Sequence, residues 1–396
     1  MGSDDRSRAA EMRVVVIGGG GTGAAITHDL TLRGFPCTLV ERGELTSGTT
    51  GRHHGQLHSG ARYAVGDEEI ARECMNEVRI LQRIAPGVIE MNHGLFLALT
   101  EDDVAYAERF QASCSAAGIS NRRISVDEAL TYEPNINPEA CFAVVVPDGT
   151  LDAYRLPLMF FATARAHGAS IRSFTEVVSI DASGGAVNSV TVWDHRNGRE
   201  ERIPADIVIN AAGPWSGKVA ATAGLDLPIT PAPGTMVAVK GRQCNMVVSH
   251  LHPPGDGDII VPQRQLTIVG TTQWETDDPD RIRTPPEDIE WLLRHATNLI
   301  PGFSACEFHA AWTAARPLAG RSNTGGRSLS RDLEVVGHKR EGLENFYSVI
   351  GGKATVLRAM GEAVSDLVCG DFDLAIPCET ASTPLLSHRE YFRKAS

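Results

Sequence analysis

Short apolar runs separated by glycine dominate the pattern at the start of the chain. Residues 13–17 are mostly β-branched, which is typical of a strand buried on both faces. A glycine-rich stretch at 18–23 follows, and residues 24–33 carry apolar positions at helical spacing. A second apolar run, 36–41, ends on an acidic residue. The pattern predicts a β-α-β unit.

Two later stretches repeat the order strand, glycine turn, helix. Residues 205–210 form an apolar run that leads into Ala-Ala-Gly-Pro-Trp-Ser at 211–216. Residues 346–350 lead into Gly-Gly-Lys at 351–353, and helix-like residues 354–369 follow. Each stretch alone is also compatible with an ordinary turn. Together with the first unit they favour one nucleotide-binding domain assembled from distant parts of the chain.

The rest of the chain is less regular. Asp67 is placed to cap a structural amphipathic helix that reaches about Ala85. Residues 87–200 and 218–340 alternate short strands and helices, which suggests an antiparallel sheet in a substrate domain. The clearest predicted strands in these stretches are 95–99, 144–146, 190–193, 236–239 and 266–269.

The first glycine-rich stretch has the spacing G-x-G-x-x-G. Gly18 permits a tight turn, Gly20 lets a pyrophosphate approach the backbone, and Gly23 lets the helix pack on the strand. Exposed amides at the helix N-terminus suit the pyrophosphate. Glu41 follows Gly18 by 23 residues, where its carboxylate can accept hydrogen bonds from a ribose. The stretch predicts a dinucleotide site, to which Gly21 and Thr22 also belong.

Composition narrows the functional classes. A net charge of −12 and a pI near 5.6 argue against a nucleic-acid partner, whose binding surface would be basic. We expect no transmembrane segment, because the sequence lacks a long apolar run. Residues 1–11 contain no signal-peptide pattern and are expected to be a short disordered tail.

We expect no metal site. The eight cysteines are scattered without a CxxC pair, which is typical of buried thiols in a reducing compartment. His53, His54 and His58 lie close together, but no HExxH motif or carboxylate spacing accompanies them.

A second glycine-rich segment, residues 46–63, reads TSGTTGRHHGQLHSGARY. Such a loop is typical of backbone that approaches a ligand closely. Thr49, Thr50 and Gly51 are expected to contact the cofactor. His58 is a candidate general base, since histidine titrates near neutrality. A role in merely orienting the loop or the cofactor is equally compatible with the sequence.

Six motifs taken together resemble the FAD-dependent glycerol-3-phosphate dehydrogenase family, above all the catalytic large subunit of its anaerobic members. The likeness spans residues 12–387. The motifs are GGGGTG, TSGTTGRHHGQLHSGARYAVGD, VPDGTLDAYRL, NAAGPW, ARPL and VIGGK.

The resemblance implies an α/β (α+β) fold similar to D-amino-acid oxidase. It has a bipartite Rossmann-type FAD-binding domain and an antiparallel-sheet substrate domain. The corresponding division is a tail at 1–11, an FAD-binding domain at 12–86, 145–225 and 335–380, a substrate domain at 87–144 and 226–334, and a C-terminal tail at 381–396.

The resemblance also implies roles for individual residues around a non-covalently bound FAD. The residues expected to hold the substrate phosphate are Arg62, Tyr63, Arg316, Arg331 and Lys353, and the expected catalytic residues are His58, Lys353 and Arg316. Besides the glycines, threonines and Glu41 already named, the expected FAD contacts are Arg42, His54, Gly55, Val177, Ala211, Gly213, Trp215, Gly352, Lys353, Ala354 and Thr355.

The implied reaction is oxidation of the C2 hydroxyl of glycerol 3-phosphate to dihydroxyacetone phosphate by hydride transfer to flavin N5. An alternative is oxidation of another hydroxylated phosphate, a phosphonate or a 2-hydroxy acid. A non-enzymatic FAD- or NAD-binding protein is the third class considered, and the anion-binding residues disfavour it.

Two departures from the family pattern bear on these expectations. No counterpart of the large subunit's C-terminal domain, which is associated with iron–sulfur binding and partner subunits, precedes Ser396. The electron acceptor is therefore left open between oxygen, a quinone and a carrier protein, and the expected location is the cytoplasm, free or peripheral to a membrane. Val356-Leu357-Arg358 replaces the usual Thr-Tyr before arginine, which leaves room for a changed substrate pocket.

Overall fold

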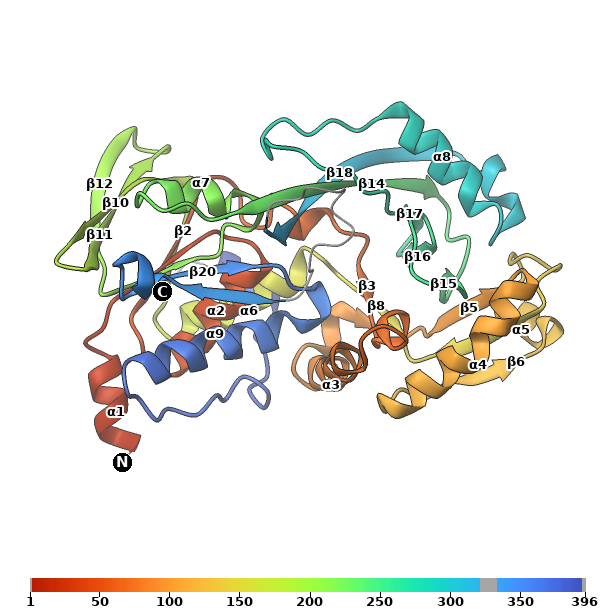
Figure 1. The fold of residues 1–396 in the computed structure, drawn as a ribbon, viewed down its shortest axis with the longest axis horizontal. Helices are drawn as coiled ribbons and strands as arrows, with labels where there is room; N and C mark the ends of the chain where they lie inside the picture. Colours follow the sequence, from red (N-terminus) through yellow and green to blue (C-terminus); the bar gives the residue numbers. More distant parts are fainter. Residues whose placement is uncertain (1, 321–332, 394–396) are drawn as a thin grey trace.

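The computed structural model describes residues 2–320 and 333–393. Figure 1 shows two lobes, joined by the long strands β14 (Ile229–Lys240) and β18 (Phe308–Ala319). Both ends of the described chain lie on the same lobe. No helix in these ranges is long and apolar enough to cross a membrane.

A six-stranded sheet forms the centre of the first lobe. Its order is β19-β20-β13-β1-β2-β9, and all neighbouring strands are parallel except β19 and β20. The predicted strands at 13–17, 36–41, 205–210 and 346–350 all belong to it. The bounds are β1 (Val14–Ile17), β2 (Cys37–Glu41), β9 (Ser170–Ser173), β13 (Ile207–Asn210), β19 (Glu334–Gly337) and β20 (Phe346–Ile350).

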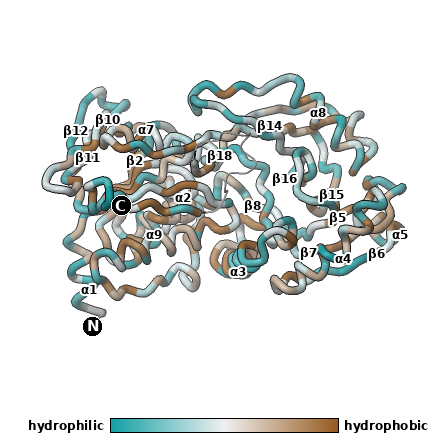
Figure 2. The backbone as a smooth tube through the Cα atoms, viewed as in Figure 1, coloured by the Kyte–Doolittle hydropathy of each residue, from teal (hydrophilic) through white to brown (hydrophobic). Residues whose placement is uncertain are grey.

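Both faces of this sheet are covered, which explains its unbroken apolar runs. Helices α2 (Gly21–Leu32), α6 (Arg155–Ala166) and α9 (Leu357–Asp371) pack together on one face (Figure 1). Val14 and Val16 point into that helical core, whereas Val15 and Ile17 point into the core on the other side. Figure 2 shows the hydrophobic residues concentrated in these layers.

The second face carries α7 (Ser216–Ala221) and a three-stranded antiparallel sheet. The predicted strand at 190–193 lies in this sheet, as the division into domains implies, and not in the substrate sheet that the strand pattern suggested. A two-residue alternation cannot tell which sheet receives a strand. The strands are β10 (Thr175–Ser183), β11 (Ala186–Asp194) and β12 (Arg199–Pro204).

An eight-stranded sheet forms the second lobe, in the order β18-β14-β17-β16-β15-β5-β7-β6. It is antiparallel as expected, except that β15 and β5 are parallel. The remaining strands are β5 (Gly94–Ala98), β6 (Arg122–Ile124), β7 (Phe142–Val146), β15 (Val247–His250), β16 (Ile259–Gln263) and β17 (Leu266–Gly270). Helices α4 (Glu101–Ala116), α5 (Val126–Tyr132) and α8 (Pro286–Ala296) pack against them.

Short elements connect the lobes. A small sheet pairs β8 (Gly149–Leu151) with β3 (Gln56–Leu57) and β4 (Ile89–Glu90). Helix α3 (Glu68–Ile84) follows β3, and the predicted cap is confirmed because the Asp67 side chain accepts a hydrogen bond from the amide of Ile70.

The N-terminal segment corrects one expectation. It forms helix α1 (Gly2–Ala9) and is not a disordered tail in its described part. Ala9 is fully buried, and the Arg6 and Arg8 guanidiniums donate to the carbonyls of Leu32 and Asp373. The sequence of a charged segment does not show such contacts with residues far along the chain. The exact division into domains stays a prediction, and strand β7 of the eight-stranded sheet runs across the expected boundary between residues 144 and 145.

Candidate active site

A cavity of about 730 Å³ lies at the carboxyl ends of the parallel strands. Ile17 ends β1, Glu41 ends β2, and the segments after β13 and β20 also line the cavity. Ligands in open α/β sheets bind at this edge. The volume falls within the range of roughly 300–1,000 Å³ that is usual for cofactor and small-molecule sites.

One end of the cavity is made mainly of backbone. Gly18 has φ +112°, and a Cβ there would lie 2.5 Å from the carbonyl oxygen of Ala211. A Cβ on Gly23 would lie 2.0 Å from the carbonyl oxygen of Gly18, so this glycine lets α2 pack on β1 as predicted. Helix α2 begins at Gly21, which places the positive end of its dipole at the cavity.

Side chains around this turn bond to its backbone. The Glu41 carboxylate accepts hydrogen bonds from the amides of Gly19 at 2.7 Å and Gly43 at 2.8 Å. The Thr50 hydroxyl accepts from the amide of Gly21 at 2.9 Å. The predicted acid and threonine therefore both line the cavity and hold the glycine turn in shape.

A charged cluster lines the same end, and the sequence indicated only its Arg42 and Trp215. Asp280 accepts hydrogen bonds from Arg42 at 2.6 Å, from the indole nitrogen of Trp215 at 2.7 Å and from Lys218 at 2.6 Å. The Arg42 guanidinium also stacks 4.7 Å from the Trp215 ring centroid. Burial would raise the pKa of Asp280, but these hydrogen bonds lower it to about 2.

The other end of the cavity is made of converging side chains. Arg316 reaches it from β18, Tyr63 and His58 from the segment after β3, and Lys353 from the turn after β20. The Lys353 ammonium lies 5.1 Å from the Tyr63 ring centroid, and the His58 ring lies 5.4 Å from the same ring. Arg316 donates a hydrogen bond to the hydroxyl of Thr271.

The histidines of the loop are neutral at physiological pH. Burial, together with the charges of Arg62 and Lys353, lowers the pKa of His58 to about 3. Burial likewise lowers the pKa of His53 to about 4 and that of His54 well below its ordinary value. A neutral imidazole can accept a proton but cannot attract an anion by charge.

Arg62, which we expected to bind substrate phosphate, is paired with other groups of the protein. Its guanidinium donates to the Asp258 carboxylate at 2.9 Å and to the carbonyl oxygen of Gly255 at 2.8 Å. It does not line the cavity. Arg331 lies outside the described residues.

Four of the expected cofactor residues are near the cavity without lining it. Gly51 and Gly55 allow close backbone contacts, since a Cβ would lie 2.5 Å from the Thr46 carbonyl oxygen or 2.8 Å from that of Leu151. Gly23 supports helix packing, and Thr355 is buried and accepts a hydrogen bond from the amide of His58. The expected cofactor residues that do line the cavity are Gly18, Gly20, Gly21, Thr22, Glu41, Arg42, Thr49, Thr50, His54, Val177, Ala211, Gly213, Trp215, Gly352, Lys353 and Ala354.

Several lining residues were missed. Thr46, Arg52 and Gln56 belong to the loop already singled out, so its composition was the available signal. Lys218 and Asp280 carry no such signal, because they come from separate surface segments and meet only in the folded chain.

The departure at 356–358 places one substituted residue at the cavity and leaves the retained arginine in the packed interior. Arg358 is buried and points to Glu77 at 2.5 Å and Glu362 at 2.5 Å, away from the cavity. Of the three residues only Leu357 lines the cavity. Leu357 is one of the two residues that replace Thr-Tyr, so the departure reaches the cavity wall, and a changed substrate pocket stays a prediction.

The glycine turn, the acid after β2 and the second lobe over the cavity define a dinucleotide-dependent enzyme. The model of the family described as FAD dependent oxidoreductase matches residues 13–367, and the chain belongs to this family. The expected fold class and cofactor are confirmed by this match. A turn that excludes side chains, beside a helix N-terminus and an acid, fits FAD.

Individual relatives agree with the family. The chain is 39% identical over 376 residues to a component of the anaerobic glycerol-3-phosphate dehydrogenase of Haemophilus influenzae, covering 94% of this chain and 67% of that one. The equivalent component from Escherichia coli K12 is 39% identical, with 95% and 70% covered. The structure of glycerol-3-phosphate dehydrogenase from Bacillus halodurans complexed with FAD superposes with a TM-score of 0.72 at 24% identity, covering 97% and 70%. The expected resemblance is confirmed.

Proposed function

We propose that this protein oxidises the C2 hydroxyl of glycerol 3-phosphate to dihydroxyacetone phosphate. One observation carries the proposal: a single cavity has the glycine turn at one end and Tyr63, His58, Arg316 and Lys353 at the other. The names of the 39% identical relatives supply the substrate. Bound FAD supplies the hydride acceptor.

Arg316 and Lys353 are the proposed phosphate ligands. A guanidinium binds a phosphate through two parallel hydrogen bonds, and an ammonium adds a point charge. Both cations line the cavity and approach it from different lobes. Tyr63, beside Lys353, would limit the room at this end and donate its hydroxyl.

His58 is the proposed acceptor of the hydroxyl proton. It lines the cavity and is neutral, and its Nδ1 is buried without a hydrogen-bond partner among the described residues. Burial and the neighbouring charges of Arg62 and Lys353 oppose protonation, so the proton would be passed on rather than stored. If His58 only orients the loop, replacing it would leave the pH dependence of turnover unchanged.

At the other end we propose that the glycine turn and the start of α2 hold the pyrophosphate and that Glu41 accepts from the ribose. Glu41 already accepts two backbone hydrogen bonds, which fix its carboxylate beside the cavity. Arg42 and Trp215 would cover the nucleotide from outside.

The test is anaerobic reduction of the purified flavoprotein by glycerol 3-phosphate, followed through the visible flavin absorbance. Rapid bleaching supports the proposal, and unchanged colour contradicts it. Admitting air afterwards separates an oxidase from a dehydrogenase. The acceptor is proposed to be oxygen, a quinone or a carrier protein, and the proposed location is the cytoplasm, free or at a membrane surface.

The Arg62–Asp258 ion pair favours a second candidate. A guanidinium already committed to a carboxylate is a poor additional phosphate ligand, so a substrate with a smaller anionic group would suit the cavity. Of the alternatives, a 2-hydroxy acid carries such a group, whereas another hydroxylated phosphate or a phosphonate would have to be bound without Arg62. The same reduction assay with these compounds separates the two candidates.

A further inference from the structure

Two histidines and an aspartate meet in the second lobe, outside the cavity. His250 ends β15, His252 follows in the loop, and Asp258 precedes β16. None of these three lines the cavity. We propose that this His–Asp cluster binds a divalent transition metal ion such as Zn²⁺, a site that is independent of the substrate.

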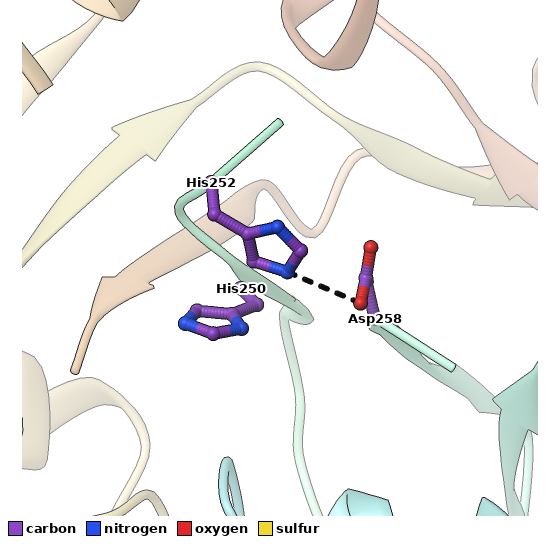
Figure 3. A group of neighbouring side chains, drawn as sticks. All are labelled: His250, His252 and Asp258. Atoms are coloured by element: carbon purple, nitrogen blue, oxygen red, sulfur yellow. Dashed lines mark ion pairs between the residues drawn. The ribbon is translucent and has the colours of Figure 1, made fainter. Parts of the chain in front are cut away.

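The strand pairing brings the cluster together. The amide of His250 donates to the carbonyl oxygen of Asp258 at 3.1 Å, next to the paired residues Ser249 and Ile259. The H-x-H spacing then carries the second imidazole to the same side, as Figure 3 shows. Strand pairing therefore holds His250 beside Asp258, and His252 joins them from the loop between the two strands.

The distances suit a metal of tetrahedral preference. One ligand atom from each residue lies within 4.8 Å of the others. His252 Nε2 and Asp258 Oδ1 are 3.2 Å apart, joined by the dashed line in Figure 3. Zinc bonds of about 2.0–2.1 Å at tetrahedral angles place neighbouring ligand atoms about 3.3 Å apart. The His250 ligand atom lies within 4.8 Å of the other two and would have to move closer to reach that separation.

The atoms not needed for the metal are already held. Asp258 Oδ2 accepts from Arg62 at 2.9 Å and from the amide of Gly255 at 2.5 Å, which leaves Oδ1 facing His252. His250 Nε2 lies 2.9 Å from the Asp103 carboxylate, so Nδ1 is its nitrogen for the metal. Metal-bound histidines and carboxylates usually have such outer partners, which orient them and raise their basicity.

Access and charge are also suitable. The Asp258 side chain is 2% exposed, whereas His250 and His252 are 20% and 25% exposed, so an ion can enter from one side. His295 Nε2 lies 3.8 Å from Asp258 Oδ1 and can supply a fourth ligand, or water can. The Arg62 charge opposes a cation, but it lies on the far oxygen of the carboxylate.

This departs from our expectation that the chain has no metal site. The histidines considered for metal binding were those of the glycine-rich loop. The H-x-H pair and Asp258 are a weak sequence signal, because the spacing has meaning only once β15 and β16 are known to pair.

The experiment is titration of metal-free holoprotein with ZnCl₂ by calorimetry, with metal analysis after desalting. We expect about one Zn²⁺ per chain, and His250→Gln and His252→Gln should each weaken binding by about 10- to 100-fold or more, because loss of an outer partner alone has an effect of that size. His309→Gln, at an exposed histidine on β18, is the matched control and should bind like the unaltered protein. Absence of stoichiometric Zn²⁺, or equal affinity in all four proteins, would overturn the proposal.

A measurement on the unaltered protein covers the case in which a variant fails to fold. Co²⁺ in a tetrahedral site has intense d–d absorption at longer wavelength than the flavin. Such a spectrum, removed by one equivalent of Zn²⁺, supports the site. An octahedral spectrum, or a Co²⁺ signal that Zn²⁺ does not displace, contradicts it.

Discussion

The two ends of the cavity are built by different means. At the nucleotide end the walls are largely backbone, held by contacts such as that between Gly18 and Ala211. At the substrate end the walls are side chains of Tyr63, Arg316 and Lys353, which come from three separate segments. The first end depends on the absence of side chains and the second on their presence.

This difference predicts how each end responds to substitution. An added methyl group at the glycine turn collides with backbone that cannot move without disturbing β1 and β13. A side chain removed at the other end leaves space and costs only its own interaction. One substitution at the nucleotide end should therefore abolish flavin binding, whereas each substitution at the substrate end should remove only one interaction.

The largest expected effect is that of Gly18→Ala. The positive φ and the 2.5 Å contact with Ala211 should destabilise the fold by about 3 kcal/mol or more and abolish flavin retention. Flavin content after gel filtration and the thermal midpoint measure this. Gly302→Ala, where a Cβ would meet nothing within 4 Å, is the control. A stable Gly18→Ala protein that keeps its flavin would contradict the idea that the nucleotide end depends on the absence of side chains.

Arg316→Ala should have the next largest effect and leave flavin in place. Loss of a charge-assisted contact costs about 1.5–3 kcal/mol, so KM should rise roughly 10- to 100-fold. Steady-state kinetics and the flavin spectrum measure the two quantities. Arg202→Ala, at an exposed residue of β12, should change neither. Loss of flavin would assign Arg316 to the nucleotide end or to folding.

Arg62→Ala tests whether Arg62 belongs to the substrate end of the cavity or stabilises the fold. Since Arg62 pairs with the buried Asp258, its removal should reduce the free energy of unfolding by about 1–3 kcal/mol. KM should change less than in Arg316→Ala. Denaturant unfolding and kinetics on the same preparation separate the effects. A rise in KM as large as that of Arg316→Ala, with an unchanged free energy of unfolding, would show that Arg62 binds the substrate.

The smallest expected effect is on how the free energy of unfolding changes with pH, to which His58 contributes. The pKa of His58 is about 3 in the folded chain and about 6.5 when unfolded, so the unfolded state takes up more protons between these values. Its contribution to stability is complete above about pH 6.5 and is lost as the pH falls toward 3.

His58→Gln should therefore flatten the dependence of the unfolding free energy on pH in that window. The slope will not vanish, because His53 and His28 also have a lowered pKa, of about 4 and about 3. Thermal midpoints between about pH 4 and 7 measure it. His309→Gln should keep the original slope. Identical slopes in the unaltered protein and His58→Gln would mean that His58 is charged or solvated.

Much of the nucleotide end was predictable, because its requirements are local. Three glycines and an acid at fixed spacing leave few backbone paths, and Gly18, Gly20, Gly23 and Glu41 lie where the motif requires. The contact between Lys218 and Asp280 at the cavity was not predictable. Both are ordinary charged residues, and only the folding of the long segment between them brings them together.

By itself the sequence determined the β-α-β unit, the class of cofactor and the segments that supply most of the cavity. Apolar period, glycine position and side-chain chemistry act over a few neighbouring residues, so they can be read along the chain. Only the tertiary structure decided which charges meet. It paired Arg62 with Asp258 instead of the cavity, ordered α1 against the first lobe, and joined His250, His252 and Asp258 across two strands. Electrostatic partners are chosen by distance in space, and sequence separation carries no information about that distance.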